Sequence, residues 1–211
     1  YVATAEVERP AREATRRTLA GPVLTTTPGT RGDALRAIEI LPGVGRTTIQ
    51  DGRPLLRGAS AFESQTFIEG VPVPLLFHFG GVTSIVSSRL LDRVELYPGN
   101  FSSRYGRAVG GIVEASVRSP QRDRWHAMLD LNFIDSSALF EAPLGKDAGI
   151  ALAARRSNID FFFENFVPAD AYSVVAAPLY WDYQGMVEQR LGKNHDLRLF
   201  AFGSRDRIKL L

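Results

Sequence analysis

Several kinds of residue are missing or scarce in this chain of 211 residues, and their absence narrows the possible functions. There is no cysteine, which excludes a disulfide scaffold, a thiolate nucleophile and a zinc–thiolate site. The three histidines, His78, His126 and His195, lack the spacing of a metal-binding pair. No G-x-S-x-G elbow and no phosphate-binding loop occurs. We therefore predict no catalytic residue, no metal site and no cofactor, and we do not expect an enzyme.

The chain also lacks a strong net charge and long apolar runs. Arginine supplies nearly all the positive charge, the formal net charge is only +2, and no basic run is long enough for a nucleic-acid patch. No stretch approaches the ~20 apolar residues of a transmembrane helix, since the run 75–82 is short and interrupted. This chain would cross a bilayer only as β-strands. No signal peptide precedes Tyr1, which predicts a mature or trimmed chain.

The first half of the chain predicts a helix and several strands. Asp33 is a suitable N-cap, the apolar residues that follow share a helical face, and Pro42-Gly43 would stop the helix. A strand should end at Gly58, where the backbone must bend. Residues 66–73 predict a β-hairpin around Glu69-Gly70, and residues 90–117 predict two strands flanking a loop rich in Gly and Ser.

The order of these motifs resembles the plug domain of TonB-dependent outer-membrane receptors. The matching elements are Leu41-Pro42-Gly43-Val44, Leu55-Leu56-Arg57-Gly58, Arg93-Val94-Glu95, Pro98-Gly99, Tyr105-Gly106, Gly110-Gly111 and Ile112–Val117. The chain departs from the family pattern at Glu69, where Asp is usual, and at Tyr97-Pro98-Gly99, where Arg-Gly-Pro is usual. The resemblance covers about residues 1–120 and implies an α+β plug domain at residues 20–119.

Residues 1–30 look extended and weakly structured, and residues 1–19 of this stretch are the expected N-terminal segment. Its opening residues resemble the TonB box, by which the periplasmic energy-transducing protein TonB grips such receptors: Tyr1, Val2, Ala3, Thr4 and Ala5. That resemblance implies binding by strand addition. A frayed terminus would have the same appearance, and both interpretations stay open.

After Pro120 apolar and polar residues alternate with a period of two. The pattern is clear in residues 125–133, 137–142, 149–154 and 181–191. A soluble β-sandwich alternates in the same way, but strand lengths near ~10 residues and the aromatic group 180–183 favour a transmembrane β-barrel. The segment 157–178 is expected to be a long extracellular loop, and Leu191–His195 a short periplasmic turn.

The barrel would be incomplete in this chain. Plugged transporters have about 22 strands, whereas residues 120–211 suffice for roughly five at ~10 residues each. An open sheet with a lipid-facing side has unpaired edges. The remaining strands would therefore come from a longer polypeptide or from another chain.

Candidate site residues follow from the resemblance. Plug arginines of this family pair with barrel carboxylates, which implies plug–barrel contacts for Arg57, Arg93 and Glu95; a surface ion pair is the alternative. Residues 72–81 match a plug loop that contacts the ligand, which implies contacts for Phe77, His78 and Phe79; a packed loop histidine is the alternative. Structural roles through positive φ or close strand approach are expected for Gly43, Gly58, Gly70, Gly99, Gly106, Gly110 and Gly111.

The resemblance implies an active-transport receptor in the outer membrane of a Gram-negative bacterium. Its partners would be TonB, outer-membrane lipid, the remaining barrel strands and an extracellular ligand whose identity the sequence does not specify. Two other functions stay open. One is an outer-membrane scaffold or assembly protein that does not transport, because fold does not determine function. The other is a soluble β-rich binding module.

Overall fold

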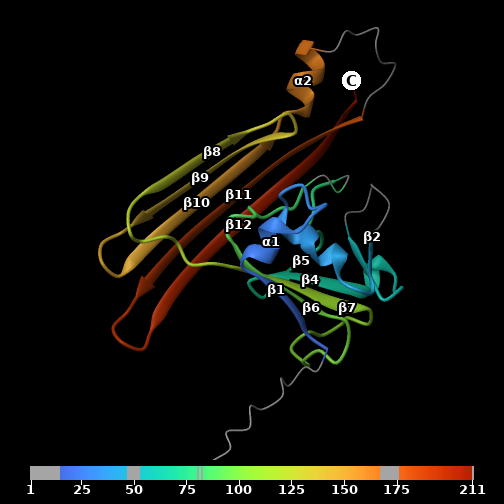
Figure 1. Ribbon diagram of the computed structural model, residues 1–211, viewed down its shortest axis with the longest axis horizontal. Helices are drawn as coiled ribbons and strands as arrows, with labels where there is room; N and C mark the ends of the chain where they lie inside the picture. Colours follow the sequence, from blue (N-terminus) through green and yellow to red (C-terminus); the bar gives the residue numbers. More distant parts are fainter. Residues whose placement is uncertain (1–14, 47–52, 80, 82, 167–175, 211) are drawn as a thin grey trace, which may run out of the picture.

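The computed structural model describes residues 15–46, 53–79, 81, 83–166 and 176–210 of the chain. In these ranges the chain forms two five-stranded sheets and a small two-stranded one (Figure 1). The elements in chain order are β1 (Arg17–Ala20), α1 (Pro22–Thr26), the 3-10 helix η1 (Ala34–Ile40), β2 (Val44–Arg46), β3 (Pro54–Leu56), the 3-10 helix η2 (Ala61–Glu63), β4 (Ser64–Ile68), β5 (Val71–Val73), β6 (Leu91–Tyr97), β7 (Gly111–Val117), β8 (His126–Leu131), β9 (Asp135–Pro143), β10 (Ala148–Ser157), α2 (Ile159–Phe166), β11 (Ala176–Arg190) and β12 (Asp196–Leu210).

The first sheet has the strand order β1-β6-β7-β4-β5. The β4–β7 pair is parallel, and the other pairs are antiparallel. All seven residues of the central strand β7 are buried, because both faces of this sheet are covered. One face packs on α1 and η1, and the other packs on Tyr105 in the loop between β6 and β7.

The predicted helix after Asp33 is present as η1. The Asp33 side chain accepts a hydrogen bond from the backbone N–H of Leu35 at 3.1 Å, which confirms the N-cap. The helix is of the 3-10 type, in which residues three apart lie on one side. Ala34 with Ala37, and Leu35 with Ile38, are such pairs, and all four are fully buried. The spacing of buried residues therefore suits the tighter helix.

The predicted hairpin joins β4 and β5. Its two turn residues, Glu69 and Gly70, have φ values of 51° and 76°. Positive φ at both central positions is the hallmark of a type I′ turn, whose twist matches that of the paired strands. A non-glycine residue in this conformation is uncommon, and Glu69 is held there by contacts described below.

The second sheet is an antiparallel meander in the order β12-β11-β10-β9-β8. Its strands run along one side of the first sheet (Figure 1). Residues of its inner face join the core of the first sheet, namely Leu139, Ala151, Ala153 and Met186. Large apolar side chains lie exposed on β8 to β12, among them Leu129, Leu131, Phe140, Leu152, Trp181, Tyr183, Leu197 and Leu199. The predicted alternation thus separates an inner face from an apolar outer face.

Two connections between these strands were predicted from the sequence: the turn 191–195 is confirmed as a short turn, and the segment 157–178 differs from the prediction. The turn after β11 is short, and Leu191 donates its backbone N–H to the carbonyl oxygen of His195 at 2.7 Å. The segment 157–178 was expected to be a loop, but residues Ile159–Phe166 form the helix α2. Among the described residues this eight-residue segment is the longest helix, and no helix there has the length and hydropathy of a membrane-spanning helix.

Candidate functional site: the contact between the two sheets

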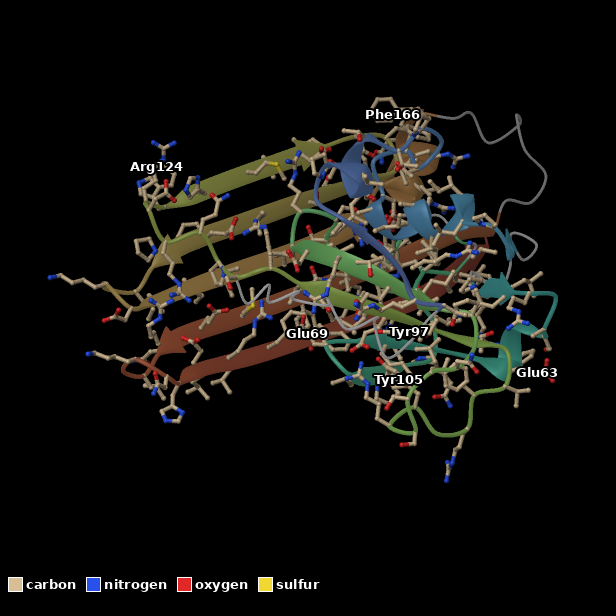
Figure 2. All side chains as sticks on the ribbon, turned by 60° about the horizontal axis from the view of Figure 1, so that its bottom comes forward. Glu63, Glu69, Tyr97, Tyr105, Arg124 and Phe166 are labelled. Carbon is tan, nitrogen blue, oxygen red and sulfur yellow. The ribbon has the colours of Figure 1, made fainter. Side chains whose placement is uncertain are left out.

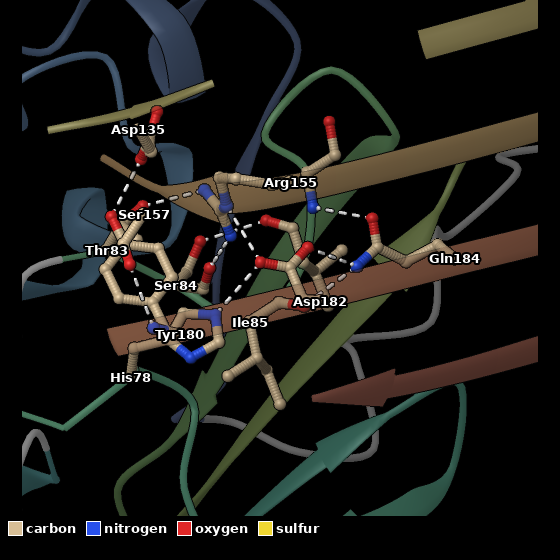
Figure 3. Close-up of polar contacts among 12 residues, drawn as sticks. His78, Thr83, Ser84, Ile85, Asp135, Arg155, Ser157, Tyr180, Asp182 and Gln184 are labelled. Carbon is tan, nitrogen blue, oxygen red and sulfur yellow. Dashed lines mark hydrogen bonds and ion pairs between the residues drawn. The ribbon is translucent and has the colours of Figure 1, made fainter. Parts of the chain in front are cut away.

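The connection between β5 and β6 reaches across to the second sheet (Figure 3). It is shaped as a narrow loop: Phe77 and Ser84 form an isolated antiparallel bridge, and His78 donates its backbone N–H to the carbonyl oxygen of Thr83 at 2.8 Å. Asp33 fixes the base of this loop, since its carboxylate accepts the backbone N–H of Ser84 at 2.6 Å. The N-cap of η1 therefore also positions the tip residues that meet β11 and β12.

His78 lies at the centre of this contact. Its Nε2 is 2.9 Å from Asp182 Oδ2 on β11, and its Nδ1 is 2.8 Å from Asp206 Oδ1 on β12. The ring stacks on Tyr180 with centroids 4.4 Å apart, and the residue is fully buried. Burial alone would lower the pKa of this imidazole. The hydrogen bonds and charges of the two carboxylates outweigh burial, so the pKa of His78 is raised above its usual value of 6.5.

Arg155 on β10 joins the same cluster from the other side. Its Nε lies 2.8 Å from Asp182 Oδ2, and its Nη1 donates to Thr83 Oγ1 at 2.8 Å. Its Nη2 also donates to the carbonyl oxygen of Ser84. Gln184 adds a hydrogen bond to the carbonyl oxygen of Ile85 at 2.9 Å. The loop is thereby bound to three consecutive strands of the second sheet.

A second contact involves the linker between β7 and β8, residues 118–125. Arg118 forms two parallel hydrogen bonds of 2.7 Å with the two carboxylate oxygens of Glu141 on β9. This two-pronged arrangement is the strongest geometry for an arginine–carboxylate pair. The Nε of Arg118 donates to the carbonyl oxygen of Arg89 at 2.7 Å. One guanidinium therefore ties the end of the first sheet to the inner face of the second.

A third contact explains the unusual residue in the β4–β5 turn. One oxygen of Glu69 accepts the backbone N–H of Val117 at 2.6 Å, and the other lies 3.3 Å from Arg198 on β12. Arg198 also donates to the carbonyl oxygen of Val117 at 2.6 Å and lies 3.4 Å from Glu188. Glu188 in turn pairs with Arg122 of the linker. Glu69 thus occupies a strained turn position in which its carboxylate connects the two sheets.

The contact between the sheets combines the shared apolar core with many charged pairs and hydrogen bonds, and part of it is open. A cavity of about 700 Å³ lies beside the His78 cluster, between the first sheet's loops and strands β8 to β10. Its lining combines apolar side chains, such as Met128 and Phe133, with polar and charged ones, including Asp33, Asp130, Asp135 and Arg155. Contacts of this kind, rich in charge and hydrogen bonds, are typical of surfaces between units that move relative to each other.

Residues 12–112 match the family model described as TonB-dependent Receptor Plug Domain. The chain carries a TonB-dependent receptor plug domain. The first sheet with α1 and η1 is this plug, and the predicted fold class, a plug followed by antiparallel barrel strands, is confirmed. The barrel strands are an open set of five within the described residues, with β8 and β12 at the edges.

Solved receptor structures share this fold. The ferric enterobactin receptor PfeA of Pseudomonas aeruginosa has a TM-score of 0.59 and 18% identity, over 95% of this chain and 34% of its own. The siderophore receptor PirA of Acinetobacter baumannii has a TM-score of 0.65 and 16% identity, over 96% of this chain and 34% of its own. The ferric-catecholate import receptor Fiu of E. coli K12 has a TM-score of 0.61 and 16% identity, over 92% of this chain and 27% of its own. The chain thus spans about a third of these receptors. A comparison with curated protein sequences finds no match.

The predicted plug–barrel residues lie within the plug. Arg57 donates to the carbonyl oxygen of Pro98 at 2.8 Å, and Arg93 pairs with Asp92 at 2.9 Å. Glu95 lies 3.5 Å from Arg16 and accepts the hydroxyl of Tyr97 at 3.0 Å. It stays a prediction that barrel strands other than β8 to β12 contact Arg57, Arg93 and Glu95.

The predicted ligand-contact residues stand side by side but differ in exposure. Phe77 and His78 are buried, whereas Phe79 is 39% exposed and donates its backbone N–H to Asp206 at 3.3 Å. Both ring nitrogens of His78 are already engaged by barrel carboxylates. A ligand contact for these residues stays a prediction, and the TonB-box candidate, residues 1–5, lies outside the described residues.

The predicted structural glycines fall into three kinds. Gly43, Gly58 and Gly70 have positive φ values. A Cβ on Gly99, Gly110 or Gly111 would lie within 3.0 Å of another plug atom, whereas one on Gly106 would meet nothing within 4 Å. Figure 2 labels three plug residues, Glu63, Tyr97 and Tyr105, which mark this part of the plug.

The residues that actually bind plug to barrel strands were missed by the sequence analysis. Within the described ranges they include Glu69, Arg118, Arg122, Glu141, Arg155, Asp182, Glu188, Arg198 and Asp206, together with His78, which had been predicted as a ligand contact. A usable signal was present on β11, where Asp182, Gln184 and Glu188 are charged or amide side chains at the inward positions of the alternation. Such side chains need partners when they face a filled interior.

Proposed function

We propose that this chain is the plug and first barrel strands of an outer-membrane receptor that imports an extracellular ligand. The observation that carries the proposal is a plug fold fastened by ion pairs to the inner face of strands whose outer face is apolar. A plug inside a barrel blocks passive flow, and the ion pairs and hydrogen bonds that hold it can be exchanged for contacts with water when it moves. In the proposed division, residues 1–19 form the N-terminal segment, 20–119 the plug and 120–211 the barrel strands.

The energy for that movement would come from TonB acting on the N-terminal segment. Support comes from the family of the plug, and from β1, which joins this segment to the plug by pairing with β6. The remaining barrel strands and the lipid of a Gram-negative outer membrane would complete the receptor. The chain holds no residue set that we assign to catalysis, and transport of this kind requires none.

Ferric siderophores are the ligand class that we propose to test first. The similar structures are a ferric enterobactin receptor, a siderophore receptor and a ferric-catecholate import receptor. At 16–18% identity these relatives support the fold alone. The ligand class is therefore our proposal.

Uptake assays test the proposed function directly. The full-length polypeptide that contains this chain would be produced in an iron-starved host that lacks its own siderophore receptors, with and without TonB. We expect one or more ferric siderophores from a panel to restore growth and to accumulate as radioactive iron only when TonB is present. Accumulation that persists without TonB, or binding of no compound with correct outer-membrane insertion, would favour the scaffold function instead.

A further inference from the structure

The contact of His78 with two barrel aspartates places a requirement on its protons. Both ring nitrogens lie within hydrogen-bond distance of a carboxylate oxygen, at 2.9 Å for Asp182 and 2.8 Å for Asp206. An ionised carboxylate only accepts hydrogen bonds, and a neutral imidazole has one N–H donor. With both aspartates ionised, both contacts are hydrogen bonds only when the imidazole carries two protons and a positive charge.

The charges around the ring also favour a doubly protonated imidazole. The acidic groups facing it are Asp182 and Asp206, and the cation on the far side of Asp182 is Arg155. The ring stacks on Tyr180, whose hydroxyl donates to Asp135 at 2.9 Å. Two carboxylates and one guanidinium leave one negative charge without a partner beside a neutral imidazole. An imidazolium removes that imbalance, which is costly in a buried site.

We propose that His78 is a positioning residue that is held as an imidazolium and fastens the plug loop to β11 and β12, so that loss of its proton loosens the loop at His78 and Phe79. Arg155 and Gln184 continue to hold Thr83, Ser84 and Ile85. The inference rests on the proposed function, because a plug must part from the barrel wall during import. It adds a chemical trigger to one defined contact. Arg118 and Arg198 hold the other contacts with charges that do not titrate at physiological pH.

The direction of the pH effect follows from the raised pKa of His78. A histidine that binds its proton more tightly in the folded state stabilises that state fully below its unfolded pKa of about 6.5. That stabilisation is lost as the pH rises through the folded-state pKa. The fastening is thus complete in acidic medium and weakens in alkaline medium. Asp206 has a side chain that is 28% exposed, which gives the proton a way to and from water.

Spin labelling of the purified full-length receptor without ligand tests this inference. This chain has no native cysteine, so a nitroxide on Phe79→Cys reports on the loop, once any cysteine elsewhere in the receptor is replaced by serine. We expect an immobile label at pH 5 that becomes mobile in a single one-proton transition by pH 10. A label on Val109→Cys, which is 81% exposed in another plug loop, should show no transition.

Matched variants assign the transition to His78. His78→Gln should abolish it, and Asp206→Asn should lower its midpoint because one carboxylate no longer favours the charged ring. His126→Gln is the control, since His126 also pairs with an aspartate, Asp123 at 2.7 Å, but at an exposed site. Its transition should match that of the unaltered receptor. A transition that persists in His78→Gln would overturn the inference.

A second measurement keeps the test decisive if His78→Gln fails to fold. Nitrogen-15 NMR of histidine-labelled receptor distinguishes a doubly protonated ring from a neutral one. We expect a doubly protonated His78 at pH 7, whereas a neutral ring at that pH would sink the proposal. Neither measurement requires ligand or TonB. Failure of the proposed transport function would therefore appear only in the uptake assay.

Discussion

At the scale of single residues, arginines of the linker and of the barrel strands carry much of the contact between plug and barrel. Arg118 makes the best-formed pair, with two 2.7 Å hydrogen bonds to Glu141. Its side chain is 26% exposed, whereas that of Glu141 is 2% exposed. Removing the arginine would leave a buried carboxylate without its counterion. That is the costly way to break an ion pair.

Arg118→Ala should therefore loosen the linker and let large antibiotics pass. One-sided loss of a buried pair costs about 3–5 kcal/mol, and the partial exposure of Arg118 places it at the lower end. Cells that produce the full-length receptor should become several-fold more sensitive to an antibiotic too large for general porins. Arg118→Lys should fall between the two, because a lysine keeps the charge but not the paired geometry.

Arg124→Ala is the matched control for this prediction. Arg124 lies in the same linker, but its side chain is 78% exposed, and the side chain of its partner Asp123 is 63% exposed. Exposed pairs contribute little, so sensitivity should stay at the level of the unaltered receptor. An equal rise in both variants would show that the linker responds to any loss of charge. The role of the Glu141 pair would then be contradicted.

Arg57 and Arg93 provide a different test at the same scale. Their described contacts lie within the plug, with Pro98 and Asp92. Cells with the double variant Arg57→Ala/Arg93→Ala test whether these residues pair with barrel strands beyond β12. If they do, entry of large antibiotics into these cells should rise. Unchanged entry would argue against their predicted plug–barrel role.

At the scale of elements, the central plug strand β7 depends on a glycine at its first position. A Cβ on Gly111 would lie 2.8 Å from Leu56 Cδ1 and 3.0 Å from the carbonyl oxygen of Tyr97. The second of these atoms is backbone, so it cannot rotate away. At Gly106, in the loop before β7, a Cβ would have no described atom within 4 Å apart from those of its chain neighbours.

Gly111→Ala should destabilise β7, whereas Gly106→Ala should not. Overpacking of a tight core costs about 1–3 kcal/mol, which corresponds to roughly 5- to 150-fold faster amide exchange through local opening. Hydrogen exchange followed by mass spectrometry of the full-length receptor would measure this on the β7 peptide. Equal protection of β7 in Gly111→Ala and the unaltered receptor would refute the close packing described here.

At the scale of the whole molecule, the second sheet has two faces of different character. Its inner face meets the plug through charges, alanines and Met186. Its outer side exposes Leu129, Leu131, Leu199 and other large apolar side chains. Single exposed apolar residues are ordinary, but a contiguous apolar surface over several strands indicates an apolar partner. In a barrel that partner is the lipid.

Labels on the outer face should therefore lie in the bilayer. A nitroxide on Leu199→Cys in the full-length receptor, reconstituted in lipid, should collide readily with oxygen and rarely with a nickel chelate. Lys193→Cys, in the short turn between β11 and β12, should show the opposite preference. Equal access of the nickel chelate to both sites would contradict a transmembrane role and favour a soluble module.

Local patterns were sufficient for most elements of the plug. The N-cap at Asp33, the bend at Gly58 and the turn at Glu69-Gly70 are each specified by one or two residues whose backbone preferences are known. The helix α1 (Pro22–Thr26) is a correction, because residues 1–30 were expected to be extended. The 3-10 form of η1 and the helix α2 were not predicted either. Both depend on packing that no local pattern records, since η1 is shaped by burial on the plug sheet and α2 contacts β11.

The sequence by itself determined the plug family, the strand alternation and the absence of a disulfide framework, because these depend on residue identity and short-range order. Only the tertiary structure decided which charges meet. His78 is 104 residues from Asp182 and 128 from Asp206 along the chain. Arg118 and Glu141, and Glu69 and Arg198, are brought together by the stacking of one sheet on the other. Pairing over such distances depends on how the sheets pack, and one sequence carries no record of that geometry.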